Sequence, residues 1–80
     1  MRKNIIGPRV SQARLRSRPR LTQQQLADRV ANLGLHIDRA GIAKIEIGLR
    51  CVCDFEVLVL AKALNVSVPW LLPARKRVRR

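Results

Sequence analysis

Aromatic residues are almost absent from this chain of 80 residues, which holds one Phe, one Trp and no Tyr. Folds that bind RNA by stacking bases on aromatic side chains need several such residues. The sequence therefore argues against that class of RNA-binding protein, although its aliphatic content is ample for one small folded domain.

Residues that carry out catalysis or bind metal are also scarce, with one His, two Cys and five acidic residues. No paired carboxylates, no nucleophile beside a base and no glycine-rich phosphate loop are recognisable. Cys51 and Cys53 are too close for a favourable intrachain disulfide, and no further ligand completes a zinc set. We therefore expect no enzyme, no cofactor and no metal, and two reduced, half-buried cysteines. An intermolecular disulfide or a redox switch is the alternative.

Long apolar runs are missing as well. The most apolar segment, 57–64, is interrupted by Lys62 and is too short to span a bilayer. No apolar run follows Met1-Arg2-Lys3, so nothing there resembles a signal peptide. The expectations are a cytoplasmic, nucleoid-associated protein without a membrane partner or an evident small-molecule ligand.

Positive charge is what the chain has in excess, with a net charge of +12. Residues 1–20 and 73–80 contain basic residues but no acidic ones, whereas residues 21–72 contain equal numbers of basic and acidic residues. Two cationic ends around a neutral middle favour polyanions, with nucleic acid first and an anionic membrane surface second. The alternative is that these arginines only keep the protein soluble.

Apolar spacing and capping residues predict helices throughout the middle and no strand. Thr22 and Gln25 match a capping box, Asp38 matches an N-cap, and Gly34 and Gly48 match helix ends. The predicted helices cover residues 7–17, 23–33, 39–46, 55–64 and 68–72. Asp54 is the predicted N-cap of the fourth helix, and the predicted inward residues include Leu33, Leu58, Leu60 and Leu64. Residues 1–5 read as a basic arm, 6–72 as the domain and 73–80 as a disordered basic tail.

The third predicted helix has an unusual outer face. Ile42 and Ile45 suit a buried stripe, which leaves small residues, two cations and an isoleucine outside: Arg39, Ala40, Ala43, Lys44 and Ile47. The major groove of B-DNA admits one α-helix and offers acceptors to Arg or Lys and thymine methyl groups to small apolar residues. Gly41 within the helix suggests close approach to a neighbouring group. This face suits a groove better than water, although an ordinary face of a small bundle is the other interpretation.

Three segments together resemble the Cro-like, XRE-type helix-turn-helix family of phage and bacterial DNA-binding regulators. They are Leu21-Thr22-Gln23-Gln24-Gln25-Leu26-Ala27, Ile42-Ala43-Lys44-Ile45-Glu46-Ile47-Gly48-Leu49-Arg50, and Leu60-Ala61-Lys62-Ala63-Leu64-Asn65-Val66-Ser67-Val68. The resemblance covers residues 5 to 72. The chain departs from it in a longer connection between the second and third helices, and in Ala40 and Gly41 where the family carries Ser or Thr.

This resemblance implies a lambda-repressor-like domain of five helices, the fifth short, that binds double-stranded DNA as a homodimer and regulates transcription, most often as a repressor. The base-reading positions that it implies are Arg39, Ala40, Ala43 and Lys44. Implied phosphate contacts are Gln23, which also braces the third helix, Gly48 through its backbone and Arg50. The charged ends add Arg2 and Lys3 as phosphate contacts. Arg14 and Glu46 match a structural ion pair between the first and third helices.

Apolar residues beyond one inward stripe leave a second function open. Phe55, Val57 and Val59 exceed what the core needs, and Trp70 lies nearby, either as a core anchor or as more surface. The alternative is therefore an antitoxin-like or protein-interaction module that binds a protein partner through these residues, with DNA binding secondary.

Overall fold

The computed structural model describes residues 2–72 of the chain. These residues form five helices and no strand: α1 (Gly7–Arg16), α2 (Gln23–Asn32), α3 (Arg39–Glu46), α4 (Asp54–Leu64) and α5 (Val68–Leu71). The all-α prediction is confirmed for this part of the chain, whereas the predicted disordered tail lies outside it. Within residues 2–72, no helix has the length and apolar character that crossing a bilayer requires.

Side-chain caps start α2 and α3 where the sequence predicts them. The Thr22 hydroxyl accepts a hydrogen bond from the Gln25 amide at 3.0 Å, and the Gln25 side chain accepts one from the Thr22 amide at 2.9 Å. This pair completes the capping box. The Asp38 carboxylate accepts from the Gly41 amide at 2.8 Å, so α3 has the predicted bounds.

Glycines follow the ends of these two helices. Gly34 and Gly48 have φ angles of 96° and 84°, a left-handed conformation that side chains disfavour. Each glycine lets the chain turn away from the helix axis, which fixes the directions of the connections from α2 to α3 and from α3 to α4.

The start of α4 differs from the prediction by one residue. Cys53, not Asp54, is the N-cap, and its amide donates to the Glu56 side chain at 3.0 Å. Asp54 is the first helical residue, and its carboxylate accepts from the Phe55 amide at 2.7 Å. Glu56 decides the boundary because it stands three residues after Cys53, where a Glu side chain can reach back to the cap.

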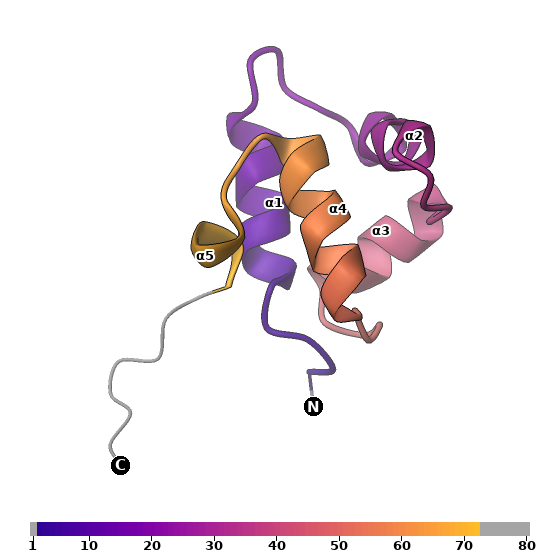
Figure 1. Ribbon diagram of the computed structural model, residues 1–80, viewed down its shortest axis with the longest axis vertical. Helices are drawn as coiled ribbons and strands as arrows, with labels where there is room; N and C mark the ends of the chain where they lie inside the picture. Colours follow the sequence, from indigo (N-terminus) through magenta and orange to yellow (C-terminus); the bar gives the residue numbers. More distant parts are fainter. Residues whose placement is uncertain (1, 73–80) are drawn as a thin grey trace.

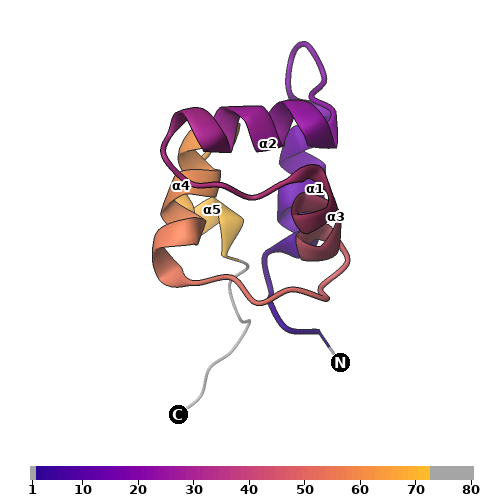
Figure 2. The same cartoon turned by 90° about the vertical axis from the view of Figure 1, so that its right-hand side faces the viewer.

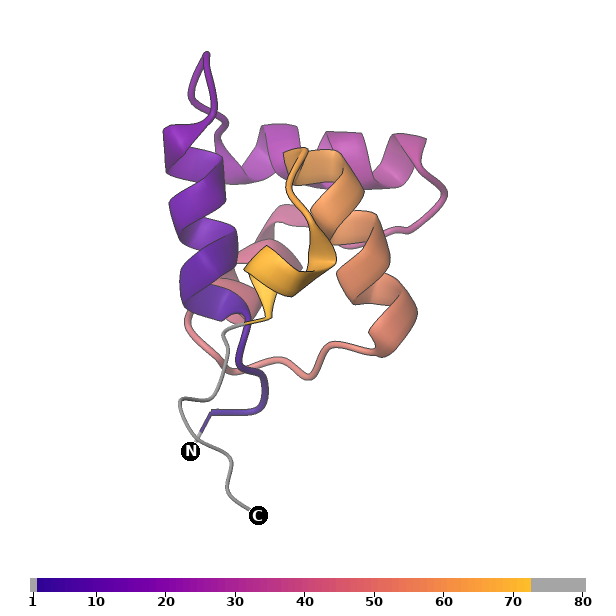
Figure 3. The same ribbon diagram turned by 60° about the vertical axis from the view of Figure 1, so that its left-hand side comes forward.

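The helices enclose one core between them. α1 and α4 lie side by side, and α5 packs against both (Figures 1 and 3). α2 crosses above α3 and α4, and α3 packs on α1 (Figure 2). Side chains from every helix and from Ile6 are fully buried there: Ile6, Val10, Leu26, Val30, Ile42, Ile45, Leu60 and Leu71.

Two predicted core residues are in fact exposed. Leu33 is 43% exposed and Leu58 is 58% exposed, while Val57 is buried in place of Leu58. In α4 the buried stripe runs through residues 57, 60, 61 and 64, the spacing of one helix face. The Leu58 prediction was wrong because α4 is apolar on both faces, so that spacing alone did not identify the inward one. Leu33 is the C-cap of α2, after the last helical residue.

Candidate nucleic-acid interface

Within residues 2–72, nothing packs over the outer face of α3. Arg39, Ala40 and Lys44 are exposed, Ala43 is half-buried and Ile47 is 59% exposed. On the opposite side of the helix Ile42 and Ile45 have no exposed surface. The four predicted base-reading residues therefore share one outward surface on a helix whose other side is anchored in the core.

Glu46 fixes the end of α3 to two other helices. Its carboxylate accepts from Arg14 Nε at 2.7 Å and from the second Arg14 guanidinium nitrogen at 3.0 Å. The Gln23 side chain donates to the same carboxylate at 3.0 Å. The predicted Arg14–Glu46 pair is thus present and largely buried, with side chains 12% and 7% exposed. Gln23 braces α3 as expected, and such bidentate contacts fix orientation as well as adding energy.

Two shallow hollows border the outer face of α3 and bring most of the predicted residues together. One, of about 500 Å³, is lined by Lys3, Asp38, Ala40, Gly41, Lys44, Leu49, Arg50 and Cys51. The other, of about 720 Å³, is lined by Arg14, Leu15, Arg20, Leu21, Thr22, Gln23, Gln24 and Arg39. Cations outnumber acids in both, which makes the surface around α3 attractive to anions.

The N-terminal segment is docked against the end of α3, a contact that was not predicted from the sequence. The Asn4 side chain donates to the carbonyls of Ile45 (3.1 Å) and Arg50 (2.8 Å) and accepts from the amides of Ile6 (3.1 Å) and Gly7 (2.8 Å). Asn4 therefore accepts from the N-cap residue and from the first residue of α1, and it ties this end of α1 to the end of α3. An Asn shortly before a helix with Pro in its first turn is a signal that could have revealed this role.

This docking changes the environment of the predicted phosphate-binding residues Arg2, Lys3 and Gly48. The Lys3 amide donates to the Gly48 carbonyl at 2.7 Å, and the Gly48 amide donates to the Ile45 carbonyl at 3.0 Å. The Arg2 side chain covers Gly48, which is buried. The Gly48 amide is therefore already bonded within the protein and shielded, which disfavours the predicted backbone contact with a phosphate. Arg2 and Lys3 are both exposed and lie over Gly48, so their side chains are the groups that a phosphate can reach there.

Arg50, another predicted phosphate contact, pairs within the protein. Its guanidinium lies 3.3 Å from each Glu56 carboxylate oxygen and also donates to the Cys51 carbonyl at 3.1 Å. Burial raises the pKa of Glu56, but the hydrogen bonds from Arg50 and from the Cys53 amide outweigh it, so that the pKa lies below its ordinary value. Arg50 is half-buried, and its charge is shared with Glu56.

The close approach expected at Gly41 is made by the protein itself. A Cβ atom at Gly41 would lie 2.7 Å from Ile37 Cγ2 and 3.1 Å from Asp38 Oδ1. Ile37 is buried beneath this turn. The glycine therefore makes room for the chain that enters α3, and a DNA contact is not needed to explain it.

Cys51 and Cys53 are both free and exposed, so the expectation of half-buried cysteines is wrong. Desolvation and then the nearby Glu56 carboxylate raise the pKa of the Cys53 thiol. Cys51 lines the hollow beside Lys44. The connection from α3 to α4 follows the surface here, which explains why neither side chain reaches the core.

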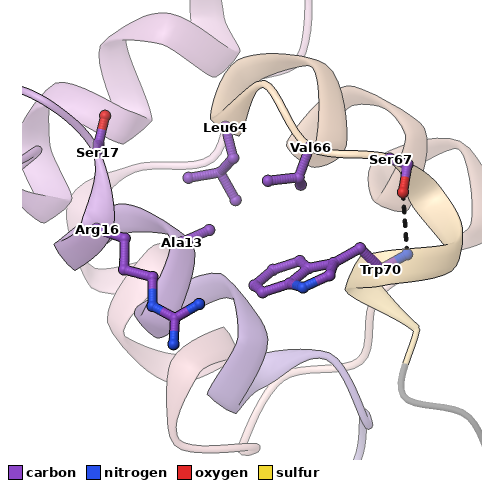
Figure 4. Close-up of a pocket in the computed structure, with 7 residues that line it drawn as sticks. All are labelled: Ala13, Arg16, Ser17, Leu64, Val66, Ser67 and Trp70. Atoms are coloured by element: carbon purple, nitrogen blue, oxygen red, sulfur yellow. Dashed lines mark hydrogen bonds between the residues drawn. The ribbon is translucent and has the colours of Figure 1, made fainter.

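Trp70 lies away from α3. Its indole lines a hollow of about 430 Å³ with residues of α1 and the end of α4, among them Ala13, Arg16 and Leu64 (Figure 4). The Arg9 guanidinium lies 4.7 Å from the ring centroid and donates to the Trp70 carbonyl at 2.8 Å. Trp70 is half-buried and packs on the core, in agreement with the anchor interpretation.

The other residues of the alternative function divide between core and surface. Phe55 is 54% exposed, Val59 is half-buried and Val57 belongs to the core. Val57 is thus unsuited to binding a partner, whereas Phe55 is available.

Comparison of the chain with protein-family models, curated proteins and solved structures gives no match.

Proposed function

We propose that this protein is a sequence-specific DNA-binding regulator of transcription. In this proposal α2 and α3 act as a lambda-repressor-like helix-turn-helix, α3 lies in the major groove, and two copies bind paired half-sites, most simply to repress transcription in the cytoplasm. The observation that carries it is the outer face of α3: two cations and two alanines on a helix held rigidly by Glu46.

Rigidity and small side chains suit groove reading. A helix in the major groove places a few side chains against base edges, and Arg or Lys donates to guanine O6 and N7. Arg39 and Lys44 are the candidates for such contacts. Ala40 and Ala43 lie between them and let the helix backbone approach the bases, where their methyl groups suit thymine methyls. Because the brace at Glu46 orders α3 before binding, little entropy is lost on docking.

In this proposal, residues at the border of the outer face of α3 contact the phosphates on either side of the groove. Lys3 lines the same hollow as Ala40 and Lys44, and Gln23 lines the other hollow beside Arg39. Arg2 lies over the connection that follows α3. Such contacts position a protein on the duplex without reading its sequence. Arg50 contributes less in this proposal, since Glu56 shares its charge.

Single substitutions on α3 test the base-reading role. On its preferred duplex we expect Arg39→Ala and Lys44→Ala each to weaken binding by about 1–3 kcal/mol and to relax sequence preference. Fluorescence anisotropy at fixed salt gives the dissociation constants. Arg16→Ala is the matched control, since it removes the same charge from the Trp70 hollow. Equal losses in all three variants would reject base reading by α3.

A protein-interaction module with DNA binding secondary is the second candidate. The exposure of Phe55 and Leu58 together favours it, because contiguous exposed apolar side chains mark surfaces that bind proteins. This candidate predicts that Phe55→Ala abolishes binding to a protein partner while Arg39→Ala leaves it unchanged. For an enzyme we see no candidate constellation among residues 2–72, and we do not propose one.

A further inference from the structure

The outward face of α4 is apolar, with opposite charges at its ends. Phe55 and Leu58 are 54% and 58% exposed, and Asp54 and Lys62 are exposed beside them. Leu33 from the end of α2 and Leu72 after α5 extend this surface, and they are 43% and 38% exposed. We call these six residues the α4 face.

Two hollows meet at Leu58 on this face. One, of about 410 Å³, is lined by Asp54, Phe55, Val57, Leu58, Val68 and Leu72. The other, of about 330 Å³, is lined by Leu33, Leu58, Val59 and Lys62. Leu58 thus forms a ridge with an apolar depression on each side, which is a shape that another helix can pack against by fitting ridges into grooves.

The spacing of the charges makes this surface complementary to itself. Asp54, Leu58 and Lys62 are four residues apart, so they lie on one stripe of the helix. Leu58 is the midpoint, with one charge about 6 Å away along the axis in either direction. If two copies of α4 pack antiparallel across Leu58, each Asp54 faces Lys62 of the other copy. Phe55 of each copy then faces the hollow beside Lys62 of the other.

From this complementarity we infer that the α4 face is the interface of a homodimer, with α4 antiparallel to α4 of a second copy. A two-fold interface must bring each surface against its own copy, and the α4 face satisfies that requirement in both shape and charge. The inference deepens the proposed function, which includes a homodimer, by assigning the surface that forms it.

Two further observations favour a second copy over a different partner. The chain carries a net charge of +12, so most contacts between two copies are repulsive, whereas the α4 face holds one charge of each sign. α4 and α3 also lie at opposite sides of the molecule in Figure 2. Pairing through α4 therefore leaves the outer face of α3 uncovered in both copies. The interface is small, so the dimer is expected to be weak, with Kd in the micromolar range or above.

Charge reversal tests the antiparallel register. In sedimentation equilibrium of the full chain without DNA, Asp54→Lys and Lys62→Asp should each raise the dimer Kd at least fivefold, because like charges then face each other. The double variant Asp54→Lys/Lys62→Asp should return the Kd to within about twofold of wild type. Failure of the double variant to recover, with helix content unchanged by circular dichroism, overturns the inference, since two independent charge effects would add.

A substitution at the centre supplies the second test. Leu58→Asp places two carboxylates together at the two-fold axis and should raise the Kd more than tenfold. Leu15→Asp is the matched control, because Leu15 is an exposed leucine of α1 outside the α4 face. A wild-type chain that stays monomeric at millimolar concentration, or equal Kd values for both variants, overturns the inference.

These measurements separate the inference from the proposed function. If the chain dimerises through α4 but prefers no DNA sequence, the inference stands and the proposed reading of DNA is rejected. If the chain binds DNA sequence-specifically but substitutions at Asp54, Leu58 and Lys62 leave its dimer Kd unchanged, the proposed function stands and the inference is rejected.

Discussion

At the scale of single residues, Glu46 ties the end of α3 to both α1 and α2. It accepts two hydrogen bonds from Arg14 and one from Gln23. The resemblance to a known family predicted the Arg14–Glu46 pair from two positions 32 residues apart. Asn4 makes two hydrogen bonds at the start of α1 and two with the carbonyls of Ile45 and Arg50. The latter two were not predicted, because only the fold brings those carbonyls to Asn4.

Removal of Arg14 tests what this pair contributes. We expect Arg14→Ala to lower the free energy of unfolding by about 3 kcal/mol, since it leaves the Glu46 carboxylate buried with a single neutral donor. Urea unfolding followed by circular dichroism measures the change. Arg16→Ala, an exposed residue on the same helix, should change it by less than about 0.5 kcal/mol. Similar losses in both variants would show that the pair adds nothing.

Gly41 offers a second test at this scale. Ala is about 1 kcal/mol better than Gly inside a helix, so helix propensity alone predicts that Gly41→Ala stabilises the protein. The structure predicts the opposite sign, because the added Cβ would lie 2.7 Å from Ile37 Cγ2. Thermal unfolding gives the sign directly. A Tm above that of wild type would mean that Ile37 moves aside at no cost.

At the scale of elements, capping residues and glycines predicted where the helices lie in the sequence better than apolar spacing predicted which face of each helix is buried. α3 has its predicted bounds because Asp38 and Gly48 are unambiguous start and stop residues. The sequence predicted that α4 is a helix but not which side of it is buried, since Leu58 was assigned to the core. Its sequence is apolar on nearly every side, so only packing against α1, α2 and α5 decides which side is buried. The same ambiguity concealed the α4 face.

The start of α4 should be sensitive to acid. Because the pKa of Glu56 is lower in the folded than in the unfolded protein, the unfolded state takes up the proton first as the pH falls. The stabilisation is complete above the ordinary carboxyl pKa and is lost as the pH drops through the folded value. We expect Glu56→Gln to show a smaller loss of unfolding free energy between pH 7 and pH 3 than wild type.

The control for this pH dependence is Asp28→Asn, at an exposed carboxylate in α2. This substitution also removes one carboxylate but leaves the Arg50–Glu56 contact in place. If Glu56→Gln and wild type lose equal amounts, the Arg50–Glu56 contact does not stabilise the folded protein.

At the scale of the whole molecule, charge is the dominant property. The sequence predicted a cationic protein built around a neutral folded middle, and the hollows beside α3 gather cations from Lys3 to Arg50. What composition did not predict is that residues 2–4 contact the end of α3 and the connection after it, since these contacts depend on the position of α3. The basic surface is therefore partly ordered before any ligand binds.

Salt dependence reports on this surface. If the protein neutralises DNA phosphates, the logarithm of its binding constant falls linearly with the logarithm of salt concentration. Lys3→Ala should reduce the magnitude of that slope by about 1 and weaken binding on all sequences alike. Arg16→Ala should leave the slope unchanged. An unchanged slope for Lys3→Ala would remove Lys3 from the phosphate contacts.

The most direct test of the central claim is a selection of binders from a random duplex DNA pool at physiological salt. We predict enrichment of an inverted repeat, as two copies of α3 reading paired half-sites require, and loss of that enrichment with the Arg39→Ala/Lys44→Ala double variant. Tight binding with no enriched sequence would contradict the claim, since the basic surface would then bind DNA without any reading by α3.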